Sequence, residues 1–247
     1  MFKILCSDIN IFKASFEAVC KIVNEVQMEI DSDGIRLNAI DPSHVTFVHL
    51  NIDEYEFDRY ECAKPLKICF DTNEFLKYLK RIGKDSLMEL SADANYLIIR
   101  AEGTTNETFK LKLIEIDDSI PPIPTIEYPN TFKVPTTLFK EIIKDISEFS
   151  QKIKITNKEN DIKFIAYGDF ADAEIQYTST DTVNDNLPEN CSAVYDVVKI
   201  EPMLKADKFA KTTSISWGND MPIFIEMKSE NEKQELSFLL APRIEVE

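Results

Sequence analysis

The chain of 247 residues can form one large domain or two of about 120 residues each, and either size can enclose a hydrophobic core. Hydrophobic residues make up 44% of the chain and charged residues 29%, a composition that excludes intrinsic disorder. The formal net charge of −16 argues against a nucleic-acid partner unless the positive charges are concentrated on one surface.

The sequence does not indicate a membrane protein, a disulfide framework or a zinc site. No apolar run approaches the roughly 20 residues that span a bilayer, and residues 1–6 follow a strand-like pattern without the apolar core of a signal peptide. We therefore expect a soluble, cytoplasmic protein with no membrane partner. The five cysteines are odd in number and form no Cys-x-x-Cys pair, so we expect buried, reduced thiols.

Helix-like and strand-like segments alternate along the chain. In the first helical segment, Phe12, Phe16 and Val19 follow the spacing that places them on one face. Residues 96–100 and 223–227 are among many segments whose apolar and polar residues alternate, which predicts antiparallel strands. The expected helices span residues 10–23, 71–84, 136–149 and 197–211.

The second half of the chain repeats the plan of the first at an offset of about 127 residues. Sequence identity between the halves is low, but four matches occur in order at nearly constant offset, which indicates two similar domains. The matched segments are 12–19 with 139–146, 33–39 with 160–166, 78–80 with 203–205 and 111–113 with 238–240.

Residues 116–128 are predicted to connect the two domains. Four prolines at positions 121, 122, 124 and 129 favour an extended, solvent-exposed segment over a helix. The domains are expected at residues 1–115 and 129–247. Each is predicted to be an α+β unit of antiparallel sheet and two helices.

Positive charge is concentrated in the four expected helices. They contain twelve Lys and Arg against eight Asp and Glu and are therefore net positive. The residues outside them carry a net charge that is more negative than that of the whole chain. One such helix alone is typical of a solvated face, but four biased alike indicate a shared cationic surface. Such a surface would contact DNA phosphates, without reading sequence, while the acidic remainder is attenuated beyond a Debye length of about 8 Å. The residues predicted to bind DNA are Lys13, Lys77, Lys80, Arg81, Lys84, Lys140, Lys144, Lys199, Lys205 and Lys208.

Three short motifs and the Pro-rich connector carry a family resemblance. They are Asn-Ala-Ile-Asp-Pro-Ser-His-Val at 38–45, Gly-Asn-Asp-Met-Pro at 218–222 and Leu-Leu-Ala-Pro-Arg-Ile-Glu at 239–245. In this order, over essentially the full length, they resemble the proliferating cell nuclear antigen (PCNA) family of DNA sliding clamps. The short final tail and compact loops resemble archaeal members.

The resemblance implies the DNA clamp fold, with sheets outside and helices inside a ring. It implies a homotrimer of six similar domains that encircles duplex DNA, serves as a DNA polymerase processivity factor and is opened by an ATP-driven clamp loader. The clamp itself is implied to have no enzymatic activity and no cofactor.

The resemblance also implies a docking site for short peptides that carry a Gln, an aliphatic residue and two aromatic residues. The implied partners are the replicative DNA polymerase, the clamp loader, flap endonuclease, DNA ligase and similar replication and repair proteins. Ordinary core packing is the alternative interpretation of these apolar positions. The matching residues are Ile40, His44, Val45, Pro121, Ile123, Pro124, Tyr128, Met221, Pro222, Leu240, Ala241, Pro242 and Ile244.

Closure of a ring requires two different edge strands in each chain, because head-to-tail contacts are heterologous. By position these strands are expected at 108–114 and 173–180, with Lys110 and Lys112 facing Glu174 of the next copy. The residues predicted at this interface are Thr108, Phe109, Lys110, Leu111, Lys112, Leu113, Glu174, Ile175, Tyr177 and Thr178.

The third and fourth helices depart from the family pattern. Glu141 and Glu148 add negative charge to the third helix, which weakens its expected contact with DNA. Pro202 makes the start of the fourth helix uncertain, because proline is best tolerated in a first turn.

Catalytic interpretations have little support. Asp41, Ser43 and His44 are residue types of a catalytic triad, but adjacency in sequence does not produce triad geometry, and no elbow motif surrounds the serine. His44 and His49 would fall on opposite faces of a strand, which argues against a shared metal ion. The five glycines are scattered and form no phosphate-binding loop.

Two alternatives to a homotrimeric clamp remain open within the binding class. They are a clamp-family subunit of a heterotrimeric ring and a monomeric viral-type processivity factor. A two-domain hydrolase is the alternative from another class, and it would turn over a nucleotide or phosphodiester unaided.

Overall fold

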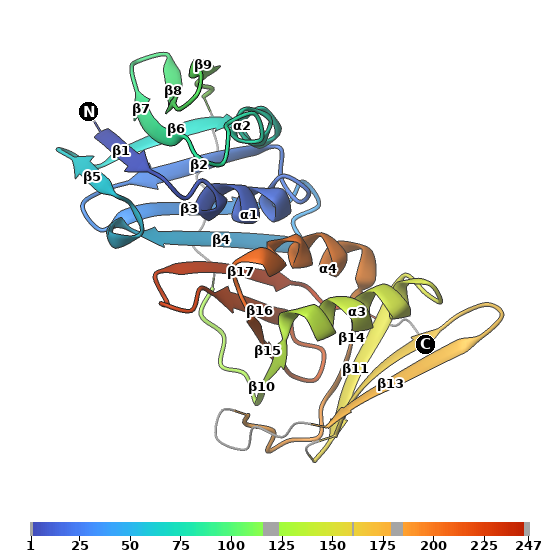
Figure 1. Ribbon diagram of the computed structural model, residues 1–247. Helices are drawn as coiled ribbons and strands as arrows, with labels where there is room; N and C mark the ends of the chain where they lie inside the picture. The colour runs from blue at the N-terminus through green and yellow to red at the C-terminus, as the bar shows by residue number, and fades with distance from the viewer. Residues whose placement is uncertain (1, 116–123, 160, 179–184, 245–247) are drawn as a thin grey trace.

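Apart from η1 and β5 in the first half and η2 in the second, the two halves of the chain have the same order of strands and helices (Figure 1). This computed structural model describes residues 2–115, 124–159, 161–178 and 185–244. The first half contains β1 (Phe2–Cys6), α1 (Asn10–Val19), β2 (Glu25–Ile30), β3 (Gly34–Ile40), β4 (Thr46–Asp53), η1 (Glu54–Glu56), β5 (Arg59–Cys62), β6 (Leu66–Asp71), α2 (Thr72–Leu79), β7 (Leu87–Ala92), β8 (Tyr96–Glu102) and β9 (Asn106–Lys112). The second contains β10 (Asn130–Pro135), α3 (Thr136–Ser147), β11 (Lys152–Lys158), β12 (Asp161–Tyr167), β13 (Asp172–Thr178), β14 (Ser192–Asp196), α4 (Val197–Met203), η2 (Leu204–Lys208), β15 (Thr212–Trp217), β16 (Ile223–Lys228) and β17 (Gln234–Leu240).

Antiparallel pairing assembles the described strands into three sheets. Their strand orders are β5-β1-β7-β8-β9, β13-β12-β11-β14 and β10-β15-β16-β17-β4-β3-β2-β6. The third sheet contains strands from both halves, because β17 pairs with β4 and brings Leu236 opposite Leu50. The predicted α+β, antiparallel clamp fold is therefore confirmed, and a continuous sheet joins the two halves.

The internal repeat predicted from sequence is visible in the sheet topology. The order β4-β3-β2-β6 in the first half corresponds to β13-β12-β11-β14 in the second. The order β1-β7-β8-β9 likewise corresponds to β10-β15-β16-β17, and a bridge from Thr131 to Asn186 occupies the place of β5. By this correspondence β13 is the counterpart of β4, and β9 is the counterpart of β17.

The helices form one layer on the same side of the sheets (Figure 1). Helix α1 contacts α2, α4 and η2, and α3 contacts α4 and η2, so the layer is continuous across both halves. The apolar faces predicted from sequence are buried in it, with Phe12 and Phe16 at 1% exposure or less. The helices are shorter than expected, since α1 ends at Val19 and α2 at Leu79.

In each half an aspartate caps the N-terminus of the second helix, α2 after β6 and α4 after β14. Asp71 accepts a hydrogen bond from the Glu74 amide at 2.8 Å at the start of α2, and Asp196 accepts one from the Val198 amide at 2.9 Å at the start of α4. Pro202 lies in the last turn of α4, not the first, and the chain continues from there as the 3₁₀ helix η2.

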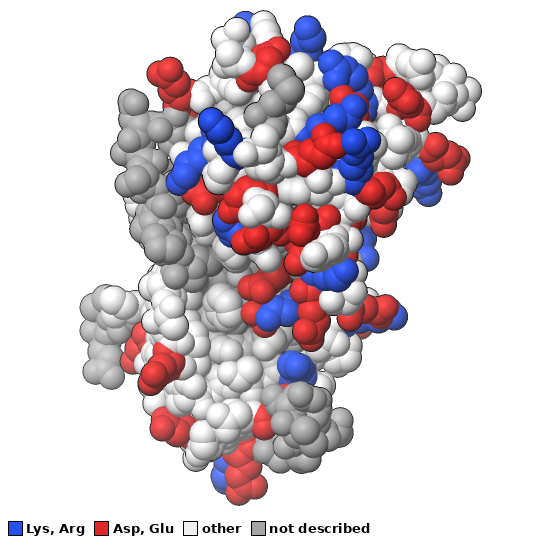
Figure 2. Space-filling view, turned by 90° about the vertical axis from the view of Figure 1, so that its left-hand side faces the viewer, with Lys and Arg blue, Asp and Glu red and all other residues white. Residues whose placement is uncertain are grey.

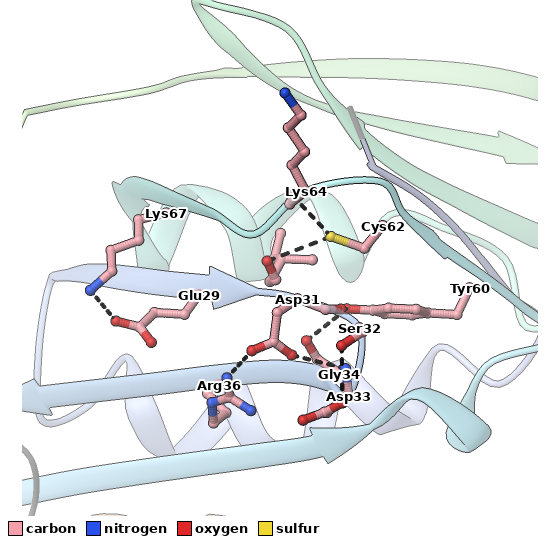
Figure 3. A network of polar contacts seen from close by, with 11 residues as sticks. Glu29, Asp31, Ser32, Asp33, Gly34, Arg36, Tyr60, Cys62, Lys64 and Lys67 are labelled. Carbon is pink, nitrogen blue, oxygen red and sulfur yellow. Dashed lines mark hydrogen bonds and ion pairs between the residues drawn. The ribbon is translucent and has the colours of Figure 1, made fainter.

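A polar network fixes the turn between β2 and β3 against β5 (Figure 3). The Tyr60 hydroxyl lies 2.8 Å from the Asp31 carbonyl and 2.6 Å from the Gly34 carbonyl, and Arg36 forms an ion pair with Asp31. Gly34 has a φ of 143°, and a Cβ there would lie 2.1 Å from the Ile52 carbonyl oxygen. Only glycine fits this close approach of two backbones.

Neither a disulfide nor a membrane-spanning helix occurs in the described part of the chain. All five cysteines are free thiols, and burial together with nearby Asp58 and Asp8 raises the pKa of Cys6 to about 12. No helix among the described residues is long and apolar enough to cross a bilayer.

Candidate functional site

The cations predicted to bind DNA all lie on the helix layer or directly after one of its helices. Three of them, on α1, α3 and α4, are half-buried, and the others are exposed. Lys13 is on α1; Lys77, Lys80, Arg81 and Lys84 are on or after α2; Lys140 and Lys144 are on α3; Lys199 is on α4; and Lys205 and Lys208 are on η2.

Positive groups from both halves converge beside α1. The Lys13 ammonium donates to the Ile82 carbonyl at 3.3 Å. Burial lowers the pKa of Lys13, the nearby charges of Lys84 and Lys208 lower it further, and Glu17 opposes them. These like charges therefore lie close enough to influence one another, and a bound anion would relieve their repulsion.

Carboxylates neutralise part of this charge. Glu17 lies 2.9 Å from the Lys208 ammonium and 3.5 Å from that of Lys80, and Lys140 forms an ion pair with Asp207. Burial alone would raise the pKa of Glu17, but the two lysines lower it. Ion pairs with this exposure contribute about 0–1 kcal/mol, so phosphates can compete for the lysines.

Four more of the cations predicted to bind DNA are exposed on or beside the helix layer. In the described residues no ion pair involves Arg81, Lys84, Lys144 or Lys205, and all four are exposed. On the side of the molecule in Figure 2, Lys and Arg are interspersed with Asp and Glu.

Asp41 organises the loop between β3 and β4, which contains His44 and Val45 of the predicted docking site. Its carboxylate is fully buried, and one oxygen accepts hydrogen bonds from the amides of Val45 at 2.9 Å and Thr46 at 2.8 Å. The other oxygen accepts from the Ser43 hydroxyl and from the Lys199 ammonium at 2.7 Å. Burial alone would raise the pKa of Asp41, but these donors hold it at about 2.

His44 and Val45, which lie in this loop, are exposed to solvent. His44 adopts a φ of 57°, its amide donates to the Asp41 carbonyl at 2.8 Å, and its side chain is exposed. Val45 is 36% exposed, while Ile40, the last residue of β3, is half-buried. Lys199 thus contacts the loop predicted to dock peptides, although the sequence grouped it with the lysines predicted to bind DNA.

The C-terminal tail joins the loop to the second half of the chain. The Ala241 amide donates to the Val45 carbonyl at 2.9 Å, and the Arg243 amide donates to the Val194 carbonyl at 2.7 Å. The Arg243 side chain lies 2.5 Å from Asp196, the residue that caps α4. The tail is therefore bound along β14, an edge strand of its sheet.

A cavity of about 590 Å³ lies beside the tail. Sequence analysis identified three of its lining residues, Ala241, Pro242 and Ile244, and Ile244 is 87% exposed. It missed the residues that β11, β14 and the turn before β16 contribute, because only the folded chain brings these strands beside the tail. The missed lining residues are Lys154, Ser192, Ala193, Val194, Asp220 and Arg243.

The remaining predicted docking residues differ in their exposure. Tyr128 stacks against Phe224 with ring centroids 6.4 Å apart, and burial raises the pKa of its hydroxyl. Pro124 is exposed, and Met221 and Pro222 are half-buried in the turn before β16. Leu240 is only 1% exposed and belongs to the core. Pro121 and Ile123 lie outside the described residues.

The two strands predicted to close a ring both lie at sheet edges. They are β9, which begins and ends two residues earlier than expected, and β13, which begins one residue earlier and whose expected residues 179 and 180 lie outside the described part of the chain. Leu113 therefore lies after β9, and Leu111 is only 6% exposed. Phe109 stacks on Tyr78 with centroids 5.1 Å apart.

Residues of the second edge also have partners within the chain. Glu174 forms an ion pair with Lys163 at 2.7 Å, and the Thr178 hydroxyl donates to Asp161 at 2.7 Å. Ile175 and Tyr177 are half-buried, while Thr108, Lys110 and Lys112 are exposed on the other edge. Both edges therefore retain exposed side chains beside backbone that a further strand could pair with.

Comparison with known proteins places this architecture in a family. Residues 1–120 match the family model described as proliferating cell nuclear antigen, N-terminal domain, and residues 122–243 match the one described as its C-terminal domain. A protein named DNA polymerase sliding clamp from Methanothermobacter thermautotrophicus is 43% identical over 247 residues, which is 100% of both chains.

Solved structures agree with these matches. PCNA from Thermococcus kodakaraensis superposes with a TM-score of 0.90 at 26% identity and covers 98% of this chain and 100% of its own. A chain of the PCNA2-PCNA3 complex from Sulfolobus tokodaii has the same fold, with a TM-score of 0.89 at 23% identity and the same coverage. The chain therefore belongs to the proliferating cell nuclear antigen family.

Proposed function

We propose that this protein is a DNA polymerase sliding clamp, three copies of which close into a ring around duplex DNA. The observation that carries the proposal is the internal repeat. Within the chain, β4 and β17 join the two halves, and their counterparts β13 and β9 are edge strands. Pairing β9 of one copy with β13 of the next repeats the internal junction between chains, and every domain then has two neighbours.

The helix layer supports the DNA-binding part of the proposal. Because the helices of both halves form one continuous layer, ring closure through the sheets places all of them on the same wall of the opening. The exposed cations of this wall meet phosphates and read no base edges, so binding is independent of sequence and sensitive to salt. A clamp of this kind is a processivity factor and not an enzyme.

The loop from Asp41 to Thr46, the C-terminal tail and the end of the connector form the proposed docking surface. We assign it to short peptides of the replicative DNA polymerase, the clamp loader, flap endonuclease and DNA ligase. One aliphatic and two aromatic anchors contribute about 1.5–3 kcal/mol each before the cost of association, which corresponds to exchangeable, micromolar-range binding. Val45, Tyr128 and Ile244 supply apolar surface for them.

The domain boundaries and location of the protein complete the proposal. We place the domains at residues 1–115 and 129–247, with 116–128 as their connector, and the two family models likewise meet close to residue 121. A clamp of archaeal type would act in the cytoplasm, where the DNA is.

Size measurement combined with a processivity assay tests the proposal. Light scattering should give three times the chain mass of 28.4 kDa, and the purified protein, with a clamp loader, should lengthen the products of a polymerase on primed circular template. A single-chain mass that rises to a ring only after a related chain is added would favour the heterotrimer instead. A monomer that supports processive synthesis unaided would favour the viral-type alternative.

A further inference from the structure

Lys199 lies on a helix of the proposed DNA-facing layer, yet its ammonium binds the loop that carries His44 and Val45. We propose that Lys199 is a positioning residue for peptide docking: it holds the Asp41 loop in its binding conformation and does not serve as a DNA contact. This inference deepens the proposed function, since it rests on the docking role of that loop.

The contact joins the two halves of the chain. The Lys199 ammonium lies 2.7 Å from one Asp41 oxygen and 3.3 Å from the Ser43 hydroxyl. The Lys199 side chain is 36% exposed and that of Asp41 is 0% exposed. An ion pair with one partner this deeply buried is screened far less than the surface pairs of Lys77 or Lys208, so a phosphate has to break a stronger contact to recruit Lys199.

The loop depends on the charge that Lys199 balances. The same carboxylate accepts the Val45 and Thr46 amides, and the Val45 carbonyl in turn accepts the Ala241 amide of the tail. Without the ammonium, the buried carboxylate keeps only uncharged donors, and burial of a poorly compensated charge is unfavourable. The loop then opens part of the time, so that water reaches the Asp41 carboxylate. The tail residue Ala241, whose amide binds the Val45 carbonyl, becomes more mobile at the same time.

Three variants test the inference. Lys199→Gln removes the charge, Lys199→Arg retains it, and Lys205→Gln removes an exposed charge from η2 that has no ion pair in the described residues. The ligand is a synthetic peptide with a Gln, an aliphatic residue and two aromatic residues, and its Kd is measured by fluorescence anisotropy. Hydrogen exchange of the Val45 and Thr46 amides reports on the loop directly.

Lys199→Gln should weaken peptide binding by about tenfold, because a loop in its binding conformation about a tenth of the time raises the apparent Kd by that factor. The Val45 and Thr46 amides should exchange faster, and duplex binding should be unchanged. Lys199→Arg should restore the peptide Kd to within about threefold of wild type. Lys205→Gln should show the reverse pattern, with weaker DNA binding and unchanged peptide Kd.

Unchanged peptide affinity together with unchanged amide exchange in Lys199→Gln would overturn the inference, as would a loss of DNA binding equal to that of Lys205→Gln. If Lys199→Gln does not fold, Ser43→Ala removes another donor to the same Asp41 oxygen and should shift both readouts in the same direction by a smaller amount. A wild-type protein that binds no such peptide would refute the docking function, whereas amide exchange would still decide the role of Lys199.

Discussion

Asp41 is ionised although it is fully buried, because four donors surround its carboxylate. Two are backbone amides of the loop it shapes, one is the hydroxyl of Ser43 and one is the ammonium of Lys199. A loop fixed in this way costs less ordering entropy when a peptide binds, which suits a docking surface.

The depressed pKa of Asp41 predicts how stability depends on pH. Since the pKa falls from 3.8 to about 2 on folding, the group contributes about 2 kcal/mol that is fully present above the unfolded pKa and is lost as pH falls through the folded one. Denaturant unfolding should show Asp41→Asn less stable than wild type at pH 7, and the difference should shrink between pH 4 and pH 2. A difference that stays constant to pH 2 would contradict this assignment.

Gly34 offers a second test at the scale of one residue. Gly34→Ala should lower the free energy of unfolding by about 2–4 kcal/mol, because its φ is positive and the new Cβ would meet the Ile52 carbonyl. Gly83→Ala is the matched control, since the nearest atom there is the Ser86 hydroxyl at 3.2 Å. Equal stability losses in the two variants, measured by urea unfolding, would show that backbone geometry at Gly34 is not limiting.

Among the strands, β9 and β13 lie at sheet edges and are the ones that we propose to pair between copies. An exposed edge is prone to non-specific association, and a lysine on it discourages wrong pairing while leaving the correct pairing available. Lys110 on β9 is such a residue, and it lies near the Tyr96 ring within its own chain. Its proposed partner across the junction is Glu174 on β13.

Charge reversal tests this pairing. Lys110→Glu should shift the ring toward monomers, with about twofold to fivefold weaker association per interface, because it places like charges opposite each other. Adding Glu174→Lys should recover part of the loss, and Lys158→Glu, a reversal at an exposed lysine on the interior strand β11, should have no effect. Light scattering over a concentration series gives the comparison, and no recovery in the double variant would refute the pairing.

For the molecule as a whole, the proposed function requires a chain of net charge −16 to bind a polyanion through its helix layer. The acidic residues elsewhere repel DNA at long range only when salt is low, because at higher salt charges farther apart than a Debye length are screened. Contacts between lysines and phosphates at short range are screened less. We therefore expect the proposed ring to bind DNA weakly from outside and stably only when the duplex is enclosed.

The double variant Lys144→Gln, Lys205→Gln tests the helix layer as a unit. Its ring should keep its mass, bind duplex DNA more weakly and show a shallower dependence of affinity on salt, by about one unit of slope for each phosphate that a lysine no longer neutralises. The corresponding control is Lys152→Gln, at an exposed lysine of β11 outside the helix layer. An unchanged salt slope in the double variant would remove these lysines from the DNA-binding surface.

The repeat, the four helices with their apolar faces, the antiparallel strands and the excess of positive charge in the expected helices can all be predicted from the sequence. These are local properties, since a helix or strand shows its period within ten residues and charge can be counted without a fold. Helix ends were less certain, because α1 and α2 end where packing and capping stop them and not where the apolar pattern stops.

Contacts between residues that are far apart in the sequence depend on the folded chain. Lys199 and Asp41 are 158 residues apart in the sequence. No periodicity indicates that the ammonium of a lysine on α4 pairs with the carboxylate of an aspartate in a loop of the first half. The tail beside β14 and the placement of Leu240 in the core likewise depend on strand order, and the pattern of a strand does not reveal its neighbours. The reason is physical: side-chain period follows from backbone geometry, whereas long-range pairing follows from the free energy of the whole chain.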